Sequence, residues 1–501
     1  MIRPCNLISI LDAKNSLTEQ ELQKYLKHFG VDIAINDNKT GMKKSELVDI
    51  EQFCKKIGRD AHVKMNFFDG FYVGYHIPQI GKEFDLLRIG KEYLVNIEIK
   101  SAADPLKVKN QLKKNRYYLK FLKKTFLYSY VVDTDSLYCL GDNDELFIAS
   151  SSELIDKISC QQLYDIGNID DLFKPSNYLV SPFNSTDKFI TDEYFLTNQQ
   201  FEIKEKVFAL LNNGNSLFIA ITGAAGTGKT LLVYDIAKSL INANKKVLIL
   251  HCAQLNSGQK LLSDAGWTIG STRYAVEKDF SSFDLIIVDE AQRATPFQFQ
   301  TIIKKVADKN KCCIFSYDSR QCLDLREIHH NIPKYIESLS LSATFRLTKK
   351  IRTNKEIASF IKLLFDKNEL KTTYNYSQIG ISFFESRKKA KEFLQYLRKD
   401  GWRVPKYTPG KMTTFQYEDY LIDGEDSAHA VIGQEFEKVV AVIDEYYYYN
   451  MNGELCNSAS SWYSQTQMLF QILTRTREKL FVVIIKNPVM LSRCLEIIHG
   501  Y

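Results

Sequence analysis

The stretch that most constrains this chain is a glycine-rich turn between an apolar run and a helical segment. Residues 218–222 are apolar or β-branched, and residues 223–230 read Gly-Ala-Ala-Gly-Thr-Gly-Lys-Thr. The spacing G-x-x-x-x-G-K-T is that of a phosphate-binding loop, in which backbone N–H groups surround phosphate oxygens at a helix N-terminus. Lys229 is expected to reach the β- and γ-phosphates, and the Thr230 hydroxyl to bind Mg²⁺. The candidate nucleotide-binding residues are Gly223, Ala224, Ala225, Gly226, Thr227, Gly228, Lys229 and Thr230.

Composition limits the class of protein. A chain of 501 residues with 45% hydrophobic residues is long enough for about three domains. The excess of 66 basic over 60 acidic residues is small, so any case for nucleic-acid binding depends on local charge. The ten cysteines include no C-x-x-C pair, which favours reduced thiols over a disulfide framework or a zinc cluster. With no signal peptide and no membrane-length apolar run, we expect a cytoplasmic protein with no membrane partner.

A second buried-type strand supports the nucleotide site. Residues 283–288 are largely apolar and lead directly into Asp289-Glu290-Ala-Gln292. After a phosphate-binding loop, an Asp-Glu pair at the carboxyl end of such a strand predicts metal and water chemistry. Asp289 is expected to hold Mg²⁺ through its shell, and Glu290 to polarise the attacking water. A third strand, residues 312–317, is followed by Asp318 and Gln321.

Residues 190–501 resemble superfamily 1 helicases, and among them the bacterial Schlafen-group-3-like helicase domains. The resemblance rests on the phosphate-binding loop, D-E-A-Q at 289–292, D-x-x-Q at 318–321, and later elements around Arg346, Glu435 and Arg475. It implies two RecA-like parallel-sheet lobes, residues 191–340 and 341–501, that use ATP and Mg²⁺ to track a single strand of DNA or RNA. The further roles that it implies are adenine recognition by Gln200, nucleotide contacts by Gln321 and Glu435, and catalytic contacts by Gln292, Arg346 and Arg475.

The N-terminal part offers a second constellation. Residues 84–89 and 93–100 predict two strands of a hairpin, which places Asp85 opposite or diagonal to Glu98. Lys100 shares a strand face with Glu98 because side chains alternate along a strand. Asp85 and Glu98 are therefore candidate ligands for Mg²⁺ or Mn²⁺, with Lys100 positioning a water. A surface salt-bridge cluster on a solvated strand face is the alternative interpretation.

The residues after this hairpin are strongly basic. From Glu98 to Lys124, nine Lys or Arg residues stand against two acidic ones. Such charge suits a polyphosphate substrate, although a charged helix face is often only solvated. Asp85, Glu98-Ile-Lys100 and Gln111 resemble the PD-(D/E)xK nuclease core of the NERD type, over residues 1–150. In that family an upstream helical glutamate often completes the site, and both Glu46 and Glu51 are candidates.

These expectations describe an α/β protein with two parts. A restriction-endonuclease-like domain (1–150) and a connector (151–190) precede the two RecA-like lobes. The two resemblances imply an ATP-dependent translocase fused to a metal-dependent nuclease, suited to DNA processing or antiphage defence with a defence-system partner protein. One alternative makes the N-terminal domain a catalytically silent nucleic-acid-binding module. Another makes the chain a signalling ATPase that senses a protein ligand.

Overall fold

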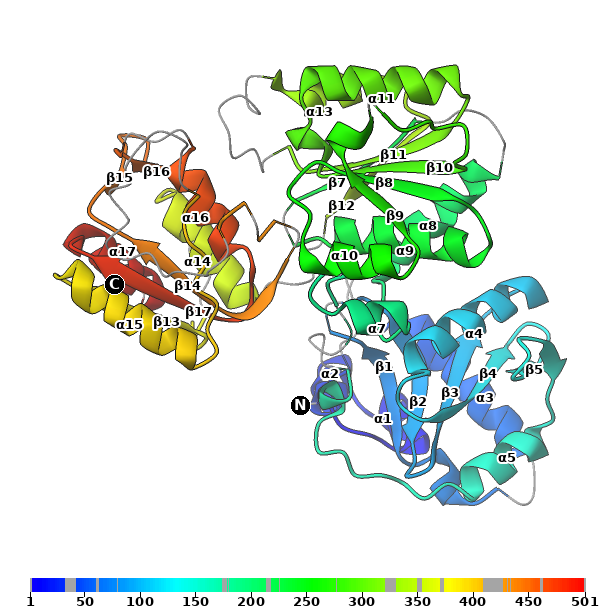
Figure 1. Cartoon of the computed structure of the whole chain (residues 1–501). Coiled ribbons are helices and arrows are strands. Elements are labelled where there is room, and N and C mark those ends of the chain that lie inside the picture. Colours follow the sequence, from blue (N-terminus) through cyan, green and yellow to red (C-terminus); the bar gives the residue numbers. More distant parts are fainter. Residues whose placement is uncertain are drawn as a thin grey trace. The chain divides into compact units, whose positions relative to one another are not determined.

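The structure, a computed structural model of the chain, divides into two compact units, Met1–Tyr178 and Leu179–Tyr501 (Figure 1). The residues that it describes are 2–31, 42–59, 63–78, 80–173, 178, 180–212, 218–224, 226–275, 277–319, 330–348, 354–369, 374–408, 427–429, 431–432, 434–459 and 463–499. Within them, no helix has both the length and the apolar character needed to cross a bilayer.

The first unit is built on a mixed six-stranded sheet in the order β1-β2-β3-β4-β5-β6. Its strands are β1 (Phe71–His76), β2 (Glu83–Ile89), β3 (Tyr93–Lys100), β4 (Lys124–Val131), β5 (Ser136–Leu140) and β6 (Leu146–Ile148). Strands β3 and β4 are parallel and the other neighbours are antiparallel. The β2–β3 register pairs Leu86 with Ile97, so Asp85 and Glu98 are neighbours across the hairpin, as the strand period predicts.

Helices cover both faces of this sheet. The helices are α1 (Leu7–Ser16), α2 (Glu19–His28), α3 (Lys44–Gly58), α4 (Pro105–Leu119) and α5 (Ser151–Ser159), with short 3₁₀ turns η1 (Met65–Phe68) and η2 (Ile169–Asp171). Val95 and Ile97 of β3 share one apolar core with α1, α2, α3 and α5. Asn96, on the other face, accepts a hydrogen bond from Asn115 of α4. The polar side of β3 therefore faces α4.

The second unit begins with a sheet of six parallel strands in the order β12-β7-β11-β10-β8-β9. The strands are β7 (Phe218–Gly223), β8 (Val247–His251), β9 (Thr268–Ser271), β10 (Leu285–Asp289), β11 (Cys312–Tyr317) and β12 (Ala343–Leu347). Helices α8 (Asn198–Leu211), α9 (Lys229–Asn242) and α10 (Ser257–Asp264) pack on one face, and α11 (Pro296–Asp308) and α13 (Ile332–Glu337) on the other. The shorter elements are α7 (Thr186–Ile190), η3 (Thr272–Ala275) and η4 (Ala291–Arg293).

Strand β12 corrects the expected boundary between the lobes. We expected residues 341–501, including Arg346, to form the second lobe. Instead β12 pairs in parallel with β7, and Arg346 lies opposite Thr222 in the first sheet. The chain returns to the edge of the first sheet at Ser342, whose backbone N–H donates to the carbonyl oxygen of Phe218, and residues 343–347 continue this pairing along β7. The first lobe therefore extends at least to Leu347.

A second parallel sheet has the order β13-β17-β14. Its strands are β13 (Ile379–Phe384), β14 (Phe436–Ile443) and β17 (Thr476–Ile485), and a separate antiparallel pair joins β15 (Tyr447–Tyr449) to β16 (Leu455–Asn457). Helices α14 (Lys355–Phe365), α16 (Gln465–Leu473) and α17 (Pro488–His499) share one core with this sheet. Helix α15 (Arg387–Lys399) packs on the sheet through a separate core.

Candidate functional site

The phosphate-binding loop lies between β7 and α9, as the sequence predicts. Gly228, the residue that precedes α9, has φ +81°. Residues with a Cβ rarely adopt this left-handed conformation. Gly223 is needed for a different reason, since an added Cβ would lie 2.8 Å from the carbonyl oxygen of Leu347 on β12. Lys229 Nζ donates to the carbonyl oxygens of Gly223 and Ala224 at 2.8 and 3.2 Å. These contacts hold the ammonium group at the mouth of the loop.

Two acidic residues stand at the carboxyl end of β10, where Asp289 ends the strand and Glu290 follows it. The Oδ2 atom of Asp289 is buried and, within the described residues, no donor meets hydrogen-bond geometry with it. An anionic oxygen in that condition suits a site for a hydrated Mg²⁺, together with Thr230 at the start of α9. Glu290 has φ +56°, an uncommon backbone conformation for a residue with a side chain. Burial would raise the pKa of Glu290, but the cations of Arg293 and Lys229 hold it below its usual value.

Gln292 joins the two acidic motifs that the sequence singles out. Its Nε2 donates to Glu290 Oε2 at 2.6 Å, and its Oε1 accepts from the backbone N–H of Asp318 at 3.2 Å. Asp318 Oδ2 lies 3.9 Å from Lys229 Nζ. The amide of Gln292 therefore fixes the carboxylate of Glu290, which gives the side chain a positioning role.

His251 is a site residue that the sequence analysis missed. It ends β8 and lies opposite Asp289 in the parallel register, with Nδ1 3.4 Å from Asp289 Oδ2. The side chain is fully buried, and among the described residues neither ring nitrogen has a partner in hydrogen-bond geometry. Its position at the end of an apolar strand is the same signal that marks Asp289. We infer that His251 orients the carboxylate of Asp289.

Substitution of His251 separates orientation from packing. His251→Asn places an amide donor near the position of Nδ1, whereas His251→Phe keeps a ring and removes the donor. Substitution of a residue that contacts a metal-binding carboxylate typically lowers metal affinity by about tenfold or more. We therefore expect His251→Phe to need about tenfold more Mg²⁺ for half-maximal ATP hydrolysis. His251→Asn should stay closer to the unsubstituted protein. An unchanged Mg²⁺ titration in His251→Phe, with unchanged thermal unfolding, would contradict the inference.

The structure gives Gln200 contacts within the chain itself. Its Oε1 accepts from the backbone N–H of Thr197, which caps α8, and its Nε2 donates to the carbonyl oxygen of Gly228 at 2.9 Å. The side chain is fully buried. These contacts make the amide a support of the phosphate-binding loop, and adenine recognition by Gln200 stays a prediction. Ala225 and Gln321 lie outside the described residues.

The two later motifs meet in the second sheet. Arg475 follows α16, is 5% exposed, and donates from Nη1 to the carbonyl oxygen of Gln434 at 3.3 Å. Its own carbonyl oxygen accepts from the backbone N–H of Phe436 at 2.9 Å. Glu435, between these residues, is also buried. Arg346 differs because it is exposed and lies on β12 of the first sheet.

One family model matches the middle of the chain. Residues 216–404 match the Schlafen group 3, DNA/RNA helicase domain. This helicase-domain match includes the phosphate-binding loop, the acidic pair, His251 and β12, and none of the first unit. No curated protein matches the sequence.

Solved structures show a weaker likeness. A Pif1 helicase from Candida albicans is 13% identical with a TM-score of 0.33, covering 60% of this chain and 98% of that one. An unliganded Pif1 from a Bacteroides species is 13% identical with a TM-score of 0.31, covering 60% and 96% of the two chains. The flagellar accessory protein FlaH from Methanocaldococcus jannaschii is 14% identical with a TM-score of 0.22, covering 28% and 76%. These scores are too low to indicate a shared overall arrangement.

In the first unit, the four predicted residues converge. Lys100 Nζ lies 3.5 Å from Asp85 Oδ2 and 3.5 Å from Glu98 Oε2. Asp85 Oδ2 accepts from the backbone N–H of Ile99 at 2.8 Å, and Gln111 of α4 donates to Glu98 Oε2 at 3.1 Å. The structure therefore brings together Asp85, Glu98, Lys100 and Gln111 across β2, β3 and α4.

Two further side chains hold Glu98. Asn115, one helical turn after Gln111, donates to Glu98 Oε1 at 2.7 Å, and Lys82 Nζ lies 3.9 Å from the same oxygen. Burial would raise the pKa of Glu98, but Lys82, Lys100 and the two amides hold it below its usual value. For Asp85, burial and the charge of Glu98 raise the pKa. Glu98 is thus held in its ionised form. A bound cation would favour the ionised form of Asp85 as well.

A small cleft of about 50 Å³ adjoins Asp85 and Lys100, and it decides between the two upstream glutamates. Glu46 lines the cleft together with Asp49 and Glu83, and burial raises the pKa of Glu46. Glu51, on another part of α3, instead accepts hydrogen bonds from Lys14 of α1 and Lys55 of α3. These contacts lower the pKa of Glu51 to about 2. Glu46 is therefore the glutamate placed to act with Asp85.

The donor set in the first unit fits a hydrated divalent cation. In the described part of the chain, no three His, Cys, Asp or Glu side chains are grouped as a metal site. Asp85 and Glu98 therefore offer two carboxylate ligands, and the remaining ligands of a bound cation would be waters. Mg²⁺ is commonly held by one or two carboxylates while it keeps several waters. The residues thus fit Mg²⁺, or Mn²⁺ as a similar hard cation.

Proposed function

We propose that this chain is an ATP-hydrolysing motor that moves along a single strand of nucleic acid. The observation that carries the proposal is the grouping of Lys229, Asp289 and Glu290 at the carboxyl ends of β7 and β10, two parallel strands with β11 between them. Ligands bind at that edge of open parallel sheets. The helicase-domain match over the same residues supports nucleic acid as the track.

Each residue of this group has a defined task in the proposed reaction. Bound ATP with Mg²⁺ supplies the phosphoryl group and its charge compensation. Lys229 exchanges its contacts with the loop carbonyls for phosphate oxygens, and Thr230 and Asp289 hold the hydrated cation. Glu290, kept ionised by Arg293 and oriented by Gln292, takes a proton from the attacking water. Arg475 meets the negative charge that develops on the transferring group.

Steady-state ATP hydrolysis with and without single strands tests the motor. The purified chain is expected to hydrolyse ATP faster when single-stranded DNA or RNA is added. Displacement of a protein bound at the strand end would then show movement along the strand. Hydrolysis that no strand accelerates would count against a translocase and favour the alternative, a signalling ATPase that responds to a protein ligand.

A second function is supported by the first unit. We infer that Asp85 and Glu98 hold Mg²⁺ or Mn²⁺ for hydrolysis of a phosphodiester, with Lys100 positioning the attacking water. The contacts of Lys100 with both carboxylates support this inference, as do the amides of Gln111 and Asn115 behind Glu98. A bound cation supplies Lewis-acid stabilisation of the phosphate charge. The alternative is a silent binding module, in which the same residues form a buried ion-pair cluster.

The two upstream glutamates provide a matched pair of variants for this proposal. We expect Glu46→Gln to slow metal-dependent cleavage about tenfold or more, because Glu46 lines the cleft beside Asp85. Glu51→Gln removes one carboxylate from the same helix, but this carboxylate pairs with Lys14 and Lys55 and does not line the cleft. The Glu51→Gln variant should therefore cleave at the normal rate. The measurement is single-turnover cleavage of labelled DNA. Equal rates in the two variants would remove Glu46 from the site.

Together these activities describe a motor that feeds or controls a nuclease. We propose a cytoplasmic enzyme that processes foreign or damaged DNA, with antiphage defence and a defence-system partner protein as the biological setting. The fusion of a helicase-domain match with a carboxylate–lysine site in one chain supports this role. Comparing phage infection of cells carrying the intact chain with that of cells carrying Lys229→Ala tests it.

A further inference from the structure

Most of the net charge of this chain is concentrated on two helices. The whole chain has a net charge of +6. Helix α15 (Arg387–Lys399) contains six Lys or Arg residues against Glu392, and α4 (Pro105–Leu119) contains five against no acidic residue. The remainder of the chain is therefore net negative, and any polyanion is attracted chiefly to these two helices.

The two helices differ in how their charge is used. On α4, Lys113 and Arg116 both pair with Asp144, at 3.0 and 2.6 Å, and Arg116 also donates to backbone carbonyls. These two of its five cations are therefore engaged within the first unit, whereas Lys107 is exposed. On α15, Lys388, Lys389 and Lys399 are exposed. Helix α15 thus directs several cations to solvent.

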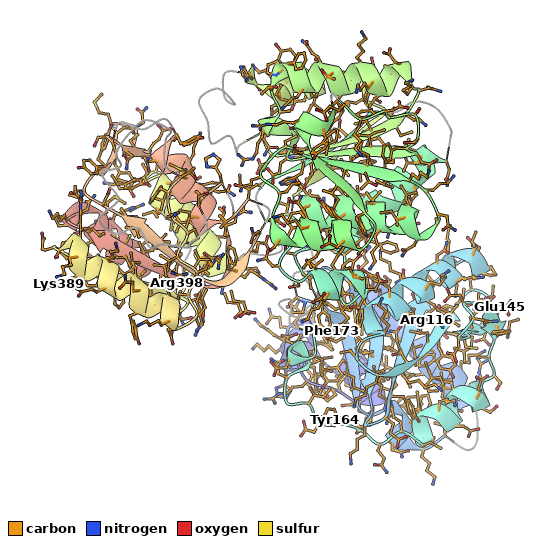
Figure 2. The ribbon with its side chains drawn as sticks, in the orientation of Figure 1. Arg116, Glu145, Tyr164, Phe173, Lys389 and Arg398 are labelled. Atoms are coloured by element: carbon orange, nitrogen blue, oxygen red, sulfur yellow. The ribbon has the colours of Figure 1, made fainter. Side chains whose placement is uncertain are left out.

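Packing fixes the direction of this surface. Ala390, Leu394 and Leu397 are buried against the second sheet, which places the remaining residues of α15 on the outside. Figure 2 shows Lys389 and Arg398 near the two ends of the helix. Tyr396 stands among these cations with 61% of its surface exposed, and its ring stacks on Phe393 at 6.1 Å. The outward face therefore presents several cations and one accessible aromatic ring.

A groove continues the positive surface beyond the helix. Its lining includes Arg398, Trp402, Arg403, Lys438 and Arg477, together with Glu435 and Glu437. Lys438 Nζ lies 5.7 Å from the centroid of the Trp402 ring. The groove thus adds a second aromatic ring and further cations at the carboxyl end of α15.

We infer that the outward face of α15, with this groove, binds single-stranded nucleic acid. We call Lys388, Lys389, Tyr396 and Lys399 the α15 face. Its lysines meet the phosphates, and Tyr396 offers a stacking surface to a base. A single strand is the occupant that fits, because a duplex keeps its base faces covered. This inference rests on the proposed motor function and gives the strand a second contact region, outside the nucleotide site.

The test compares direct strand binding across salt concentrations. We expect the triple variant Lys388→Gln, Lys389→Gln, Lys399→Gln to bind a fluorescent oligothymidylate at least about tenfold more weakly at low salt. Its slope of log affinity against log salt should be smaller by about 2, since each phosphate contact to a single strand contributes about 0.7. Tyr396→Leu should weaken the single strand at least about fivefold and leave a blunt duplex unaffected. Glu392→Gln on the same helix should tighten binding.

A matched control carries the same charge change elsewhere. Lys24, Lys27 and Lys304 are also exposed, and replacing these three by Gln should leave the salt slope unchanged. Equal losses in the two triple variants, or no loss in the α15 triple, would overturn the inference. So would equal weakening of strand and duplex with no effect of Tyr396→Leu, since that result describes a general polyanion surface. Because binding is measured without ATP, absent stimulation of hydrolysis would count against the motor alone.

Discussion

Glu290→Gln is expected to lower the maximal rate of ATP hydrolysis by about a hundredfold or more, with ATP still bound. In the proposed reaction the carboxylate is the base that takes the proton of the attacking water, and a glutamine amide has no comparable basicity. The substitution keeps the size of the side chain, and its amide can still contact Gln292. Single-turnover hydrolysis at saturating ATP gives the rate, and equilibrium binding of a fluorescent nucleotide gives the affinity.

Lys229→Ala provides the contrasting result in the same site. Loss of the ammonium group removes a contact with the phosphates, so nucleotide affinity itself should fall. Both variants should unfold at temperatures close to that of the unsubstituted chain, because Lys229 contacts loop carbonyls and the carboxylate of Asp318 and takes no part in an apolar core. Turnover like that of the unsubstituted chain in both variants would remove the hydrolysis assignment.

If the proposed nuclease site is correct, Asp85→Ala should abolish metal-dependent cleavage and Glu98→Gln should reduce it severely, because the proposal makes each carboxylate a metal ligand. Asp85 is the cleaner test, since its side chain is 28% exposed and that of Glu98 is 1% exposed. Removing Glu98 outright would leave Lys82 buried without its carboxylate, which destabilises a fold. Glutamine at position 98 keeps the size of the side chain and one acceptor oxygen for the amide donors of α4, and it removes the negative charge.

The cleavage assay uses labelled DNA and RNA, with and without ATP, in Mg²⁺ or Mn²⁺. ATP hydrolysis by Asp85→Ala should be unchanged, which controls for folding and for the motor. Lys100→Ala should retain metal binding and cut slowly. Cleavage that survives in Asp85→Ala and Glu98→Gln would place the nuclease elsewhere. No cleavage by the unsubstituted chain under any of these conditions would favour the silent binding module.

Local patterns in the sequence predict the chemistry of both sites. The spacing of residues 223–230 predicts a loop that the structure places between β7 and α9. The two-residue period of a strand predicts that Glu98 and Lys100 share a face and that Asp85 meets them across a hairpin. In both cases the deciding contacts involve residues close in sequence, where the geometry of one strand or one turn determines the outcome.

Long-range pairing explains what the sequence does not predict. Arg346 belongs to a motif that the sequence analysis assigns to the second lobe, but whether residues 343–347 join the first or second sheet depends on competition between two distant partners. The choice of Glu46 over Glu51 depends on which face of α3 meets β2. His251 gains its role only when β8 aligns with β10, and Gln200 only when α8 lies against the phosphate-binding loop.

Strand β12 has a mechanical consequence. It is the last strand of the first sheet before the chain continues toward the second, and it pairs with β7 from Ala343↔Ile219 to Leu347↔Gly223. Tension along β12 would be shared in shear by this whole row of hydrogen bonds, whereas peeling would break them one at a time. Because β7 ends in the phosphate-binding loop, the strand that would carry such a load is bonded directly to the nucleotide site. Gly223, which lets Leu347 approach, then matters as much for transmitting force as for binding phosphate.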